Sequence, residues 1–430
     1  KIRETVFLYK LCRYDQRMTE TYWIETLGCP KNEVDSEKLA GTLHQEGMIL
    51  ADSVNEADLV VVKTCAFIED AQQESIETVL AIHDIRHSKS DLVVTGCMAE
   101  RYGDDLHEAL DEDVDAVVGF GVPVTLKKKP VVPEFDLLNL PRPKSDRPWG
   151  YVKVAEGCDR ICGFCSIPSF RGAQRSRTLH SILQEIELMD LQEVVLVAQD
   201  LASYGRDVAE DISISDLYNQ VLDLVPWVRL LYLYPSSLTE SLTGQIANSA
   251  VPYFDLSLQH VSSPLLRRMR RWGNSQKFTD LIARIRSQNS EAVFRTNFII
   301  GYPGETEDDH DKLLYFVEEN QIDWCGFFSY SREENTYAAA LDGQLSASLV
   351  RERLQELNEL QDSITASRRD ALIGKEIDVL VDADGVGRSF REAPEIDGIV
   401  HVPKNLEVGM FSTVKVTEAT GIDLVASNNF

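Results

Sequence analysis

The chain has 430 residues, and at roughly 100 to 200 residues per domain this length predicts two to four domains. Its 43% hydrophobic and 26% charged residues are typical of globular proteins, which excludes a disordered chain. With 43 Lys and Arg against 70 Asp and Glu, the formal net charge is −27. This charge excludes binding to nucleic acid by bulk attraction, and a basic protein partner suits the chain better.

The sequence contains no membrane-span pattern. A span needs roughly 18 to 20 uninterrupted apolar residues, and the start of the chain also lacks the apolar core of a signal peptide. We therefore expect a cytoplasmic protein with no membrane partner. The first residues are basic and precede Met18. We assign residues 1–20 to an extension, which is either a mis-called upstream start or a short ordered segment.

The region 21–125 alternates strand-like and helix-like segments. Such alternation implies right-handed crossovers and a parallel α/β sheet. The predicted strands are 22–26, 58–64, 91–96 and 115–120. The predicted helices are 35–46 and 71–85.

Three cysteines each follow one of these strands, namely Cys29, Cys65 and Cys97. The carboxyl ends of parallel strands share one edge of a sheet, and open α/β sheets bind ligands there. The sequence therefore predicts a three-thiolate site at this edge. The alternative is three buried cysteines that pack as small apolar residues.

Residues 126–148 are rich in Pro and Lys and lack periodicity, so we predict a linker there. Strand–helix alternation resumes over 149–344 and predicts a partial (βα)6 barrel, with its active site on the carboxyl-end loops. Its strands are predicted at 149–157, 193–200, 229–235, 253–259, 293–301 and 323–330.

The loop after the first barrel strand carries Cys158, Cys162 and Cys165 in a C-x3-C-x2-C spacing. In a reducing cytosol, clustered thiols indicate metal or redox ligands before disulfides. Three thiolates are one too few for a closed zinc or four-iron site, so one metal keeps an open position for a reacting ligand. The alternative is a zinc loop that a residue elsewhere completes, for instance a His.

A charged helical pattern covers 345–369 and connects to a last segment at 370–430. That segment contains short strands broken by Gly, Pro and Asn, which predict a small antiparallel barrel of OB-like character. Residues 368–430 hold seven Lys and Arg against eleven Asp and Glu, a net charge of 7 − 11 = −4. Such barrels often bind RNA, but this one is acidic.

At this point several motifs together resemble one family. The loop GCDRICGFC resembles the radical S-adenosylmethionine signature, and the rest resembles the methylthiotransferases over residues 21 to about 428. GCPKN and RSFREAPEIDG resemble the branch that modifies an aspartate of ribosomal protein S-twelve. The supporting motifs are LGCPKNEVDSE (27–37), KTCAFIEDA (63–71), VTGCMAERY (94–102), IPSFRGAQRSR (167–177), AQDLASYG (198–205), DLSLQH (255–260) and FIIGYPGET (298–306).

The resemblance implies two [4Fe-4S] clusters and S-adenosylmethionine as cofactors. Cys158, Cys162 and Cys165 would hold the cluster that binds S-adenosylmethionine, and the three cysteines of region 21–125 would hold an auxiliary cluster. The middle domain is then a TIM-like radical S-adenosylmethionine barrel and the last a TRAM domain. The target carbon bears an unactivated hydrogen that no ordinary side-chain base removes, which is why the chemistry needs a radical.

Further residues are candidates for contacts with S-adenosylmethionine. For each of them the alternative is a structural role in packing or in a loop. No catalytic side chain is assigned. Gln199 and Asp200 end the second barrel strand, and Arg295 could pair with a carboxylate. The candidate set is Phe164, Gln199, Asp200, Gln259, Arg295 and Gly301. The run RRMRR at 267–271 is interpreted as a solvated helix face or as a contact for an acidic partner, and His260 as a satisfied loop histidine.

The expected reaction adds a methylthio group to the β-carbon of an aspartate in ribosomal protein S-twelve, either free or within the assembled subunit. The other expected partners are a sulfur donor and an electron donor such as flavodoxin or ferredoxin. The nearest alternative is a tRNA adenosine methylthiotransferase acting on i6A or t6A with the same clusters. A tRNA-binding barrel should carry a basic face, so the acidic C-terminal barrel favours a basic ribosomal protein. A nonenzymatic iron–sulfur or zinc scaffold is the third alternative.

Overall fold

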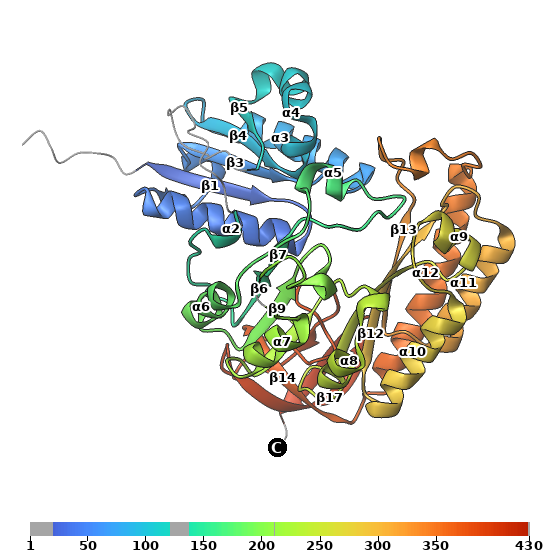
Figure 1. Ribbon diagram of the computed structural model, residues 1–430. Helices are drawn as coiled ribbons and strands as arrows, with labels where there is room; N and C mark the ends of the chain where they lie inside the picture. The colour runs from blue at the N-terminus through green and yellow to red at the C-terminus, as the bar shows by residue number, and fades with distance from the viewer. Residues whose placement is uncertain (1–19, 121–136, 210, 429–430) are drawn as a thin grey trace, which may run out of the picture. The chain divides into compact units, whose positions relative to one another are not determined.

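A computed structural model describes residues 20–120, 137–209 and 211–428 (Figure 1). The extension predicted at residues 1–20, apart from Glu20, lies outside these residues, and so does much of the predicted linker. The structure divides into two compact units. The first ends at Pro143, and the second holds the chain from Lys144 onward together with Phe67–Glu69.

The first unit is built on a sheet of five strands in the order β2-β1-β3-β4-β5. The strands are parallel as predicted, but β2 was not among the predicted strands. The chain moves from β1 to β2 in one direction and then returns to β3 on the other side of β1. The carboxyl ends of β1 and β3 therefore flank a topological switch point, which is where open α/β sheets bind ligands. The strands are β1 (Thr21–Thr26), β2 (Ile49–Leu50), β3 (Leu59–Thr64), β4 (Asp91–Gly96) and β5 (Ala116–Val118).

Helices pack on both sides of this sheet, with α2 on one side and α4 on the other (Figure 1). The first helix begins at Pro30, five residues before its predicted start, because proline has a preset φ and suits the first helical position. Cys29 is thus the N-cap of α2, and Cys97 is the first residue of α4. The helical elements are α2 (Pro30–Gln45), α3 (Glu69–Ile85), α4 (Cys97–Leu110) and the short η1 (Val54–Glu56), η2 (Asp111–Asp113) and η3 (Leu137–Asn139).

The second unit begins with a partial barrel of six parallel strands, which confirms the predicted (βα)6 architecture. Two three-stranded sheets, β10-β9-β6 and β11-β12-β13, meet at a bridge between Leu233 and Leu256. The third strand ends at Leu230, earlier than predicted, because Tyr232 has a φ of 65° and Pro235 starts a short helix. The strands are β6 (Trp149–Lys153), β9 (Glu193–Val197), β10 (Trp227–Leu230), β11 (Tyr253–Gln259), β12 (Val293–Ile300) and β13 (Trp324–Ser329).

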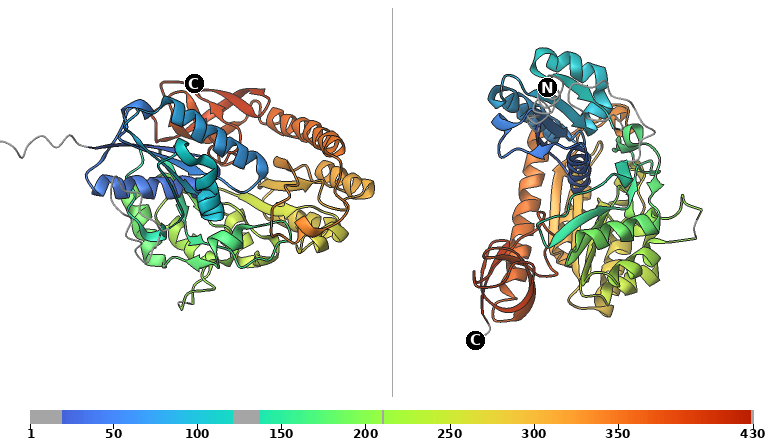
Figure 2. Two further views of the ribbon diagram at one scale, coloured as in Figure 1. Left: turned by 90° about the horizontal axis from the view of Figure 1, so that it is seen from above. Right: turned by 90° about the vertical axis from the view of Figure 1, so that its left-hand side faces the viewer.

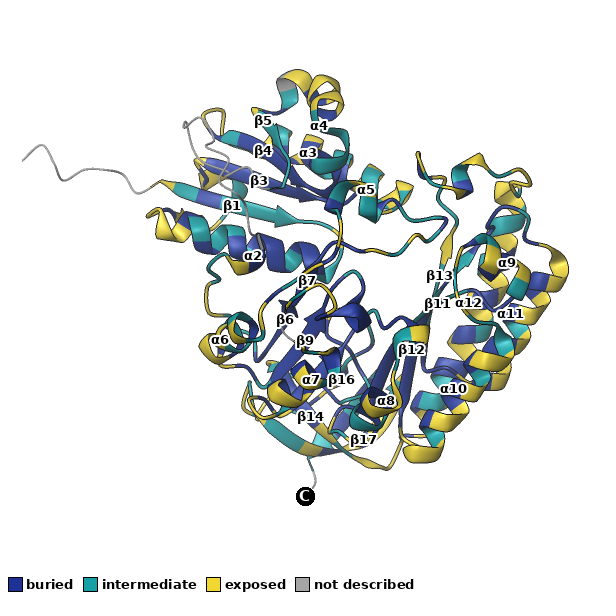
Figure 3. Ribbon diagram, in the orientation of Figure 1, coloured by how far each residue is buried: buried dark blue, intermediate teal, exposed yellow. Residues whose placement is uncertain are grey.

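The helices of the barrel cover its outer side, and Figure 3 shows buried strands beneath helices α10 and α11 with exposed outer faces. A side-chain oxygen caps most of the longer helices by accepting a backbone N–H, as Ser, Thr and Asn do at N-caps. The capping residues are Thr178, Ser213, Thr239, Asn274, Thr306 and Ser346. The remaining elements are β7 (Ala155–Glu156), α5 (Ile167–Arg171), β8 (Arg175–Ser176), α6 (Leu179–Met189), η4 (Leu201–Ser203), α7 (Ile214–Leu222), η5 (Pro235–Ser237), α8 (Glu240–Ala247), α9 (Ser263–Arg268), α10 (Ser275–Gln288), α11 (Glu307–Asn320) and η6 (Ala338–Ala340).

A long helix, α12 (Ala347–Asp370), leads to a closed five-stranded barrel at the C-terminal end (Figure 2, right). Strand β18 follows Gly421 and was not among the predicted strands. The barrel is antiparallel as predicted except where β16 pairs with β18 in parallel. Its strands are β14 (Glu376–Ala383), β15 (Val386–Arg388), β16 (Val400–His401), β17 (Phe411–Thr420) and β18 (Asp423–Asn428).

Residues 388–397, which we call the clasp segment, join this small barrel to the amino-terminal end of the six-stranded barrel. Each of the six strands contributes one side chain to it. Four polar contacts are short: Tyr151 to the Pro394 carbonyl (2.8 Å), Glu193 to Arg388 (2.7 Å), Arg229 to the Phe390 carbonyl (3.0 Å) and Trp324 to the Arg391 carbonyl (2.8 Å). The Tyr253 hydroxyl donates to Asp397 (2.5 Å), and Arg295 pairs with Asp397 (3.5 Å). The clasp segment therefore spans both three-stranded sheets.

In the described part of the chain, no helix combines the length and apolarity needed to cross a membrane.

Candidate active site

The loop that carries Cys158, Cys162 and Cys165 lies at the carboxyl end of the first barrel strand, between β7 and α5. Backbone hydrogen bonds fix the middle of this loop. The Gly163 N–H donates to the Met269 carbonyl at 2.8 Å, and the Ala338 N–H donates to the Gly163 carbonyl at 2.7 Å. A Cβ at position 163 would lie 3.0 Å from the Arg268 carbonyl oxygen, so glycine suits this position. The loop is thus held from both sides.

The three thiols have the chemistry of metal ligands. Burial raises the pKa of the Cys158 thiol to about 11 and that of Cys165 to about 12, so each keeps its proton until a metal displaces it. The Cys158 sulfur accepts the Arg160 backbone N–H at 3.4 Å. Within the described ranges, no three Cys, His, Asp or Glu side chains are close enough to hold a metal ion as they stand.

Asp200 follows the second barrel strand, β9, and lies beside this loop. Its Oδ2 accepts the Arg160 Nε at 2.5 Å and the Ser203 hydroxyl at 2.6 Å. The guanidinium of Arg160 also donates to Ser237 at 2.7 Å. Asp200 Oδ1 is buried without a hydrogen-bond partner. A buried acceptor without a donor suits a ligand that carries N–H or O–H groups.

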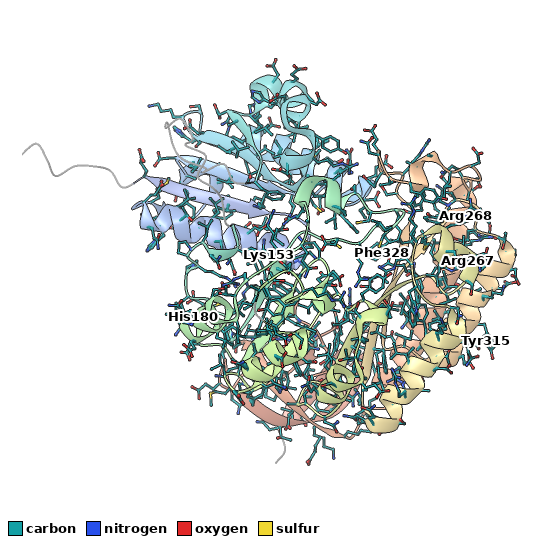
Figure 4. All side chains as sticks on the ribbon, in the orientation of Figure 1. Lys153, His180, Arg267, Arg268, Tyr315 and Phe328 are labelled. Atoms are coloured by element: carbon teal, nitrogen blue, oxygen red, sulfur yellow. The ribbon has the colours of Figure 1, made fainter. Side chains whose placement is uncertain are left out.

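Gln199 lies in a buried network that sequence reasoning missed. Its Nε2 donates to Glu156 at 2.7 Å, and its Oε1 is buried and has no partner. Glu156 also accepts from Lys153 at 2.7 Å and from Arg171 at 2.9 Å. Burial alone would raise the pKa of Glu156, but Arg171 and Lys153 outweigh it and hold this pKa well below its usual range. Figure 4 labels Lys153, which comes from β6. The signals available in the sequence were Lys153 and Glu156, charged residues within the otherwise apolar strand predicted at 149–157.

The other predicted contacts are placed differently. Phe164 is half-buried and packs against the barrel core, and Gln259 ends β11 with a φ of 72°. Gly301 has a φ of 80°, and a Cβ there would lie 2.5 Å from Val350, so packing against α12 explains this glycine. Its N–H donates to Glu305 at 2.6 Å.

Arg295 lies away from this group. It is the third residue of β12 and lies three residues before Phe298, the register partner of Gln259, or roughly 10 Å along the strand. Its guanidinium pairs with Asp255 at 3.2 Å as well as with Asp397 of the clasp segment. Arg295 therefore belongs to the amino-terminal end of the barrel, and we do not carry it into a cofactor assignment.

In the first unit, the second group of cysteines gathers around Asn32. The Asn32 amide donates to the Leu27 carbonyl at 2.9 Å and to the Thr64 carbonyl at 3.0 Å, while Cys97 Sγ lies 3.6 Å from its Oδ1. A Cβ on Gly28 would lie 2.9 Å from Cys65 Sγ, which brings the residue before Cys29 against Cys65. The loops after β1, β3 and β4 thus converge, as predicted from the strand ends. Asn32 was missed, although it is the last letter of GCPKN.

Both ends of this group favour an anion. Cys29 caps α2 and Cys97 begins α4, and a helix N-terminus carries a partial positive charge that stabilises nearby negative charge. The Ser75 hydroxyl accepts the Cys65 N–H at 3.0 Å and fixes the loop after β3. The three thiols therefore suit a thiolate-bound, negatively charged group.

Comparison with known families agrees with the division of the chain. Residues 21–119 match the family described as "Uncharacterized protein family UPF0004". Residues 152–317 match the radical SAM superfamily, and residues 373–428 match the TRAM domain. Among solved structures, the cobalamin-dependent S-adenosylmethionine radical enzyme OxsB covers 80% of this chain and 56% of its own, with a TM-score of 0.47 and 12% identity. That likeness is too low to support an inference.

Relatives match nearly the whole chain. One relative is the protein of Thermoanaerobacter sp. (strain X514) named "Ribosomal protein uS12 methylthiotransferase RimO", which is 39% identical. The match covers 94% of this chain and 98% of that protein. The proteins of the same name from Aquifex aeolicus and Geobacter sulfurreducens are 39% and 38% identical, over 95% and 96% of their lengths and 93% of this chain. The chain belongs to this methylthiotransferase family, whose catalytic domain is of the radical SAM superfamily.

Proposed function

We propose that this protein is an enzyme that attaches a methylthio group to the β-carbon of an aspartate in ribosomal protein S-twelve (uS12). The observation that carries the proposal is the near-complete likeness to relatives named for that reaction on that protein. The three-thiol loop at the carboxyl end of a (βα)6 barrel supports it, because active sites of such barrels lie at that end.

In this proposal Cys158, Cys162 and Cys165 hold a [4Fe-4S] cluster that leaves one iron open. When bound, this cluster supplies the electron that cleaves S-adenosylmethionine and so makes removal of an unactivated hydrogen possible. The chain keeps the three thiols at fixed positions through Gly163, whose two backbone hydrogen bonds anchor the middle of the loop.

Gln199 and Asp200 are proposed to orient S-adenosylmethionine. Each has one buried oxygen without a donor, and the amino and ribose hydroxyl groups of S-adenosylmethionine are donors. Glu156 accepts the Gln199 amide N–H, which leaves the amide oxygen as the free acceptor. Lys153 and Arg171 hold Glu156 ionised, so the orientation of Gln199 persists over the ordinary pH range. Contacts of Phe164, Gln259 and Gly301 with S-adenosylmethionine stay predictions from the sequence.

Cys29, Cys65 and Cys97 are proposed to hold a second [4Fe-4S] cluster, which would carry the sulfur to be transferred. Support comes from their convergence around Asn32 at a sheet switch point and from the two helix N-termini. The reaction then needs a sulfur donor and a one-electron donor such as flavodoxin or ferredoxin. A cytoplasmic location follows from a ribosomal substrate and from thiols that must stay reduced.

Charge supports a protein substrate over tRNA. Residues 368–430 carry a net charge of 7 − 11 = −4, whereas a tRNA-binding barrel needs a basic face. A ribosomal protein is basic and therefore suits an acidic surface.

The test is mass spectrometry after anaerobic reaction of the reconstituted protein with S-adenosylmethionine, sulfide and a reductant. Free S-twelve, assembled small subunits and bulk tRNA serve as parallel substrates. We expect a gain of about 46 Da on S-twelve, since SCH3 replaces H. The same gain on tRNA adenosine alone would overturn the proposed substrate.

Two cysteine variants separate the two thiol groups. Cys162→Ala should abolish cleavage of S-adenosylmethionine, because the loop loses an iron ligand. Cys65→Ala should retain cleavage and lose methylthiolation, because it lies in the other group. Chromatography of the cleavage products measures the first step, and S-twelve mass measures the second. Equal cleavage by Cys162→Ala and the unaltered protein would contradict the ligand assignment.

A further inference from the structure

One cation makes direct contact with a thiol of the three-cysteine loop. Arg271 Nη1 lies 3.4 Å from Cys162 Sγ, within hydrogen-bond distance for sulfur. Its Nη2 donates to the Ser257 carbonyl at the end of β11. The Arg271 guanidinium thus links the thiol loop of the first sheet to a strand of the second.

The charge of Arg271 is not balanced by the protein. No carboxylate among the described residues pairs with it, and its Nε is buried without an acceptor. Arg160, on the same loop, differs because Asp200 neutralises it at 2.5 Å. Three thiolates on a doubly positive [4Fe-4S] core sum to about one negative charge, so the loaded loop would supply the missing anion. The donor set and the unbalanced cation therefore fit such a cluster.

The orientation of Arg271 is built into the fold. Tyr234 lies between Arg271 and Arg160, with each guanidinium carbon 3.9 Å from the ring centroid. Helix α9 ends at Arg268, and Arg270 adopts a left-handed conformation with a φ of 55° that reverses the chain. The Arg271 N–H then donates to the Leu266 carbonyl at 2.7 Å. A stacked guanidinium with a fixed backbone loses little entropy when it donates to sulfur.

We propose that Arg271 is a positioning residue that makes the cluster on Cys158, Cys162 and Cys165 easier to reduce. A hydrogen bond to a ligating sulfur and a nearby positive charge both stabilise the state that has gained an electron. The step is uptake of one electron by the cluster from an external one-electron donor, and no bond to Arg271 forms or breaks. The inference rests on the proposed function only in requiring that the cluster be present.

This assignment divides the RRMRR run, which the sequence analysis interpreted as a solvated helix face or as a contact for an acidic partner. Arg267 and Arg270 are exposed, and Arg270 stacks over Tyr337 with its guanidinium carbon 4.2 Å from the ring centroid. Figure 4 shows Arg267 and Arg268 on α9, well separated from Lys153 of the first barrel strand. Only the last arginine of the run contacts a cysteine of the loop among the described residues. Arg270 therefore provides a matched control with the same charge one position away.

The experiment is an anaerobic potentiometric titration of the reconstituted full chain, with dithionite as reductant and the reduced cluster followed by EPR. The titration is made in a Cys65→Ala background, which lacks one ligand of the second cluster, and the signal followed is the one that changes when S-adenosylmethionine is added. For Arg271→Gln we expect the ratio of reduced to oxidised cluster at a fixed potential to fall about tenfold, a shift of about 59 mV for one electron. Arg271→Lys, which keeps the charge, should shift less, and Arg270→Gln should match the unaltered protein.

A midpoint in Arg271→Gln equal to that of the unaltered protein would overturn the inference, and so would an equal shift in Arg270→Gln. If Arg271→Gln takes up no iron, Tyr234→Leu tests the same idea, because it keeps the cation but removes its aromatic support. We expect a smaller shift in the same direction there, and an unchanged midpoint would count against the inference. Absence of iron from the unaltered protein would overturn the proposed function as well, which separates the two failures.

Discussion

Glu193 is the residue whose removal should most weaken the attachment of the C-terminal barrel. It is fully buried, and its two oxygens meet two guanidiniums, Arg229 at 2.9 Å and Arg388 of the clasp segment at 2.7 Å. In Glu193→Gln the amide NH2 replaces one acceptor and faces an N–H donor. The charge of one buried guanidinium also becomes uncompensated, which typically costs about 3 to 5 kcal/mol. For a unit of this size, that cost lowers Tm by roughly 10 °C.

Differential scanning calorimetry of the full chain measures this change, with limited proteolysis to detect release of residues 371–430. The matched control is Glu291→Gln, because Glu291 pairs with Arg391 of the same clasp segment but its side chain is 57% exposed. An exposed pair contributes about 0 to 1 kcal/mol, so this variant should shift Tm by about 3 °C at most. Equal shifts in the two variants would refute the reasoning that burial sets the cost.

Three further predictions concern the loops and the pH dependence. Gly163→Ala should lower iron content and stability by about 1 to 3 kcal/mol because its Cβ would crowd a backbone carbonyl, whereas Gly244→Ala in α8 has room and should be neutral or stabilising. Burial raises the pKa of Asp397 to about 6, so the folded protein holds this proton more tightly than the unfolded chain does. The resulting stabilisation is complete below about pH 4 and is lost, by up to roughly 3 kcal/mol, as the pH rises through 6. Asp397→Asn should remove this pH dependence of Tm. Asn32→Ala should lose iron from one cluster and retain the other, measured by iron analysis and EPR, because two loop carbonyls lose their donor; unchanged iron would contradict its role.

Most strands and the cysteine positions could be predicted because they depend on local patterns. Apolar strands that end in cysteine place Cys65 and Cys97 at one sheet edge whatever the rest of the chain does. The six barrel strands were recovered for the same reason. β18 was missed, and its pairing with β16 is set by barrel closure rather than by its own sequence.

Contacts between distant segments could not be predicted. Arg295 is the third residue of the strand predicted at 293–301, but the sequence does not show that two carboxylates pair with it. One of these, Asp397, is about a hundred residues away in the sequence. Arg271 was overlooked for a related reason, because four neighbouring cations hide which one turns toward Cys162. Such partners become visible only when the fold brings the segments together.

The charges inside the six-stranded barrel are compensated differently at the two ends of its strands. At the amino-terminal end, Glu193 lies between two arginines and Arg295 between two aspartates, so the protein supplies an opposite charge for each. A layer of compensated charges like this one leaves no charge for a ligand to neutralise. At the carboxyl-terminal end, Asp200 keeps a free oxygen and Arg271 keeps an unbalanced charge. Because an uncompensated charge in a protein interior costs stability, its retention at the carboxyl-terminal end is best explained by a bound ligand that neutralises it.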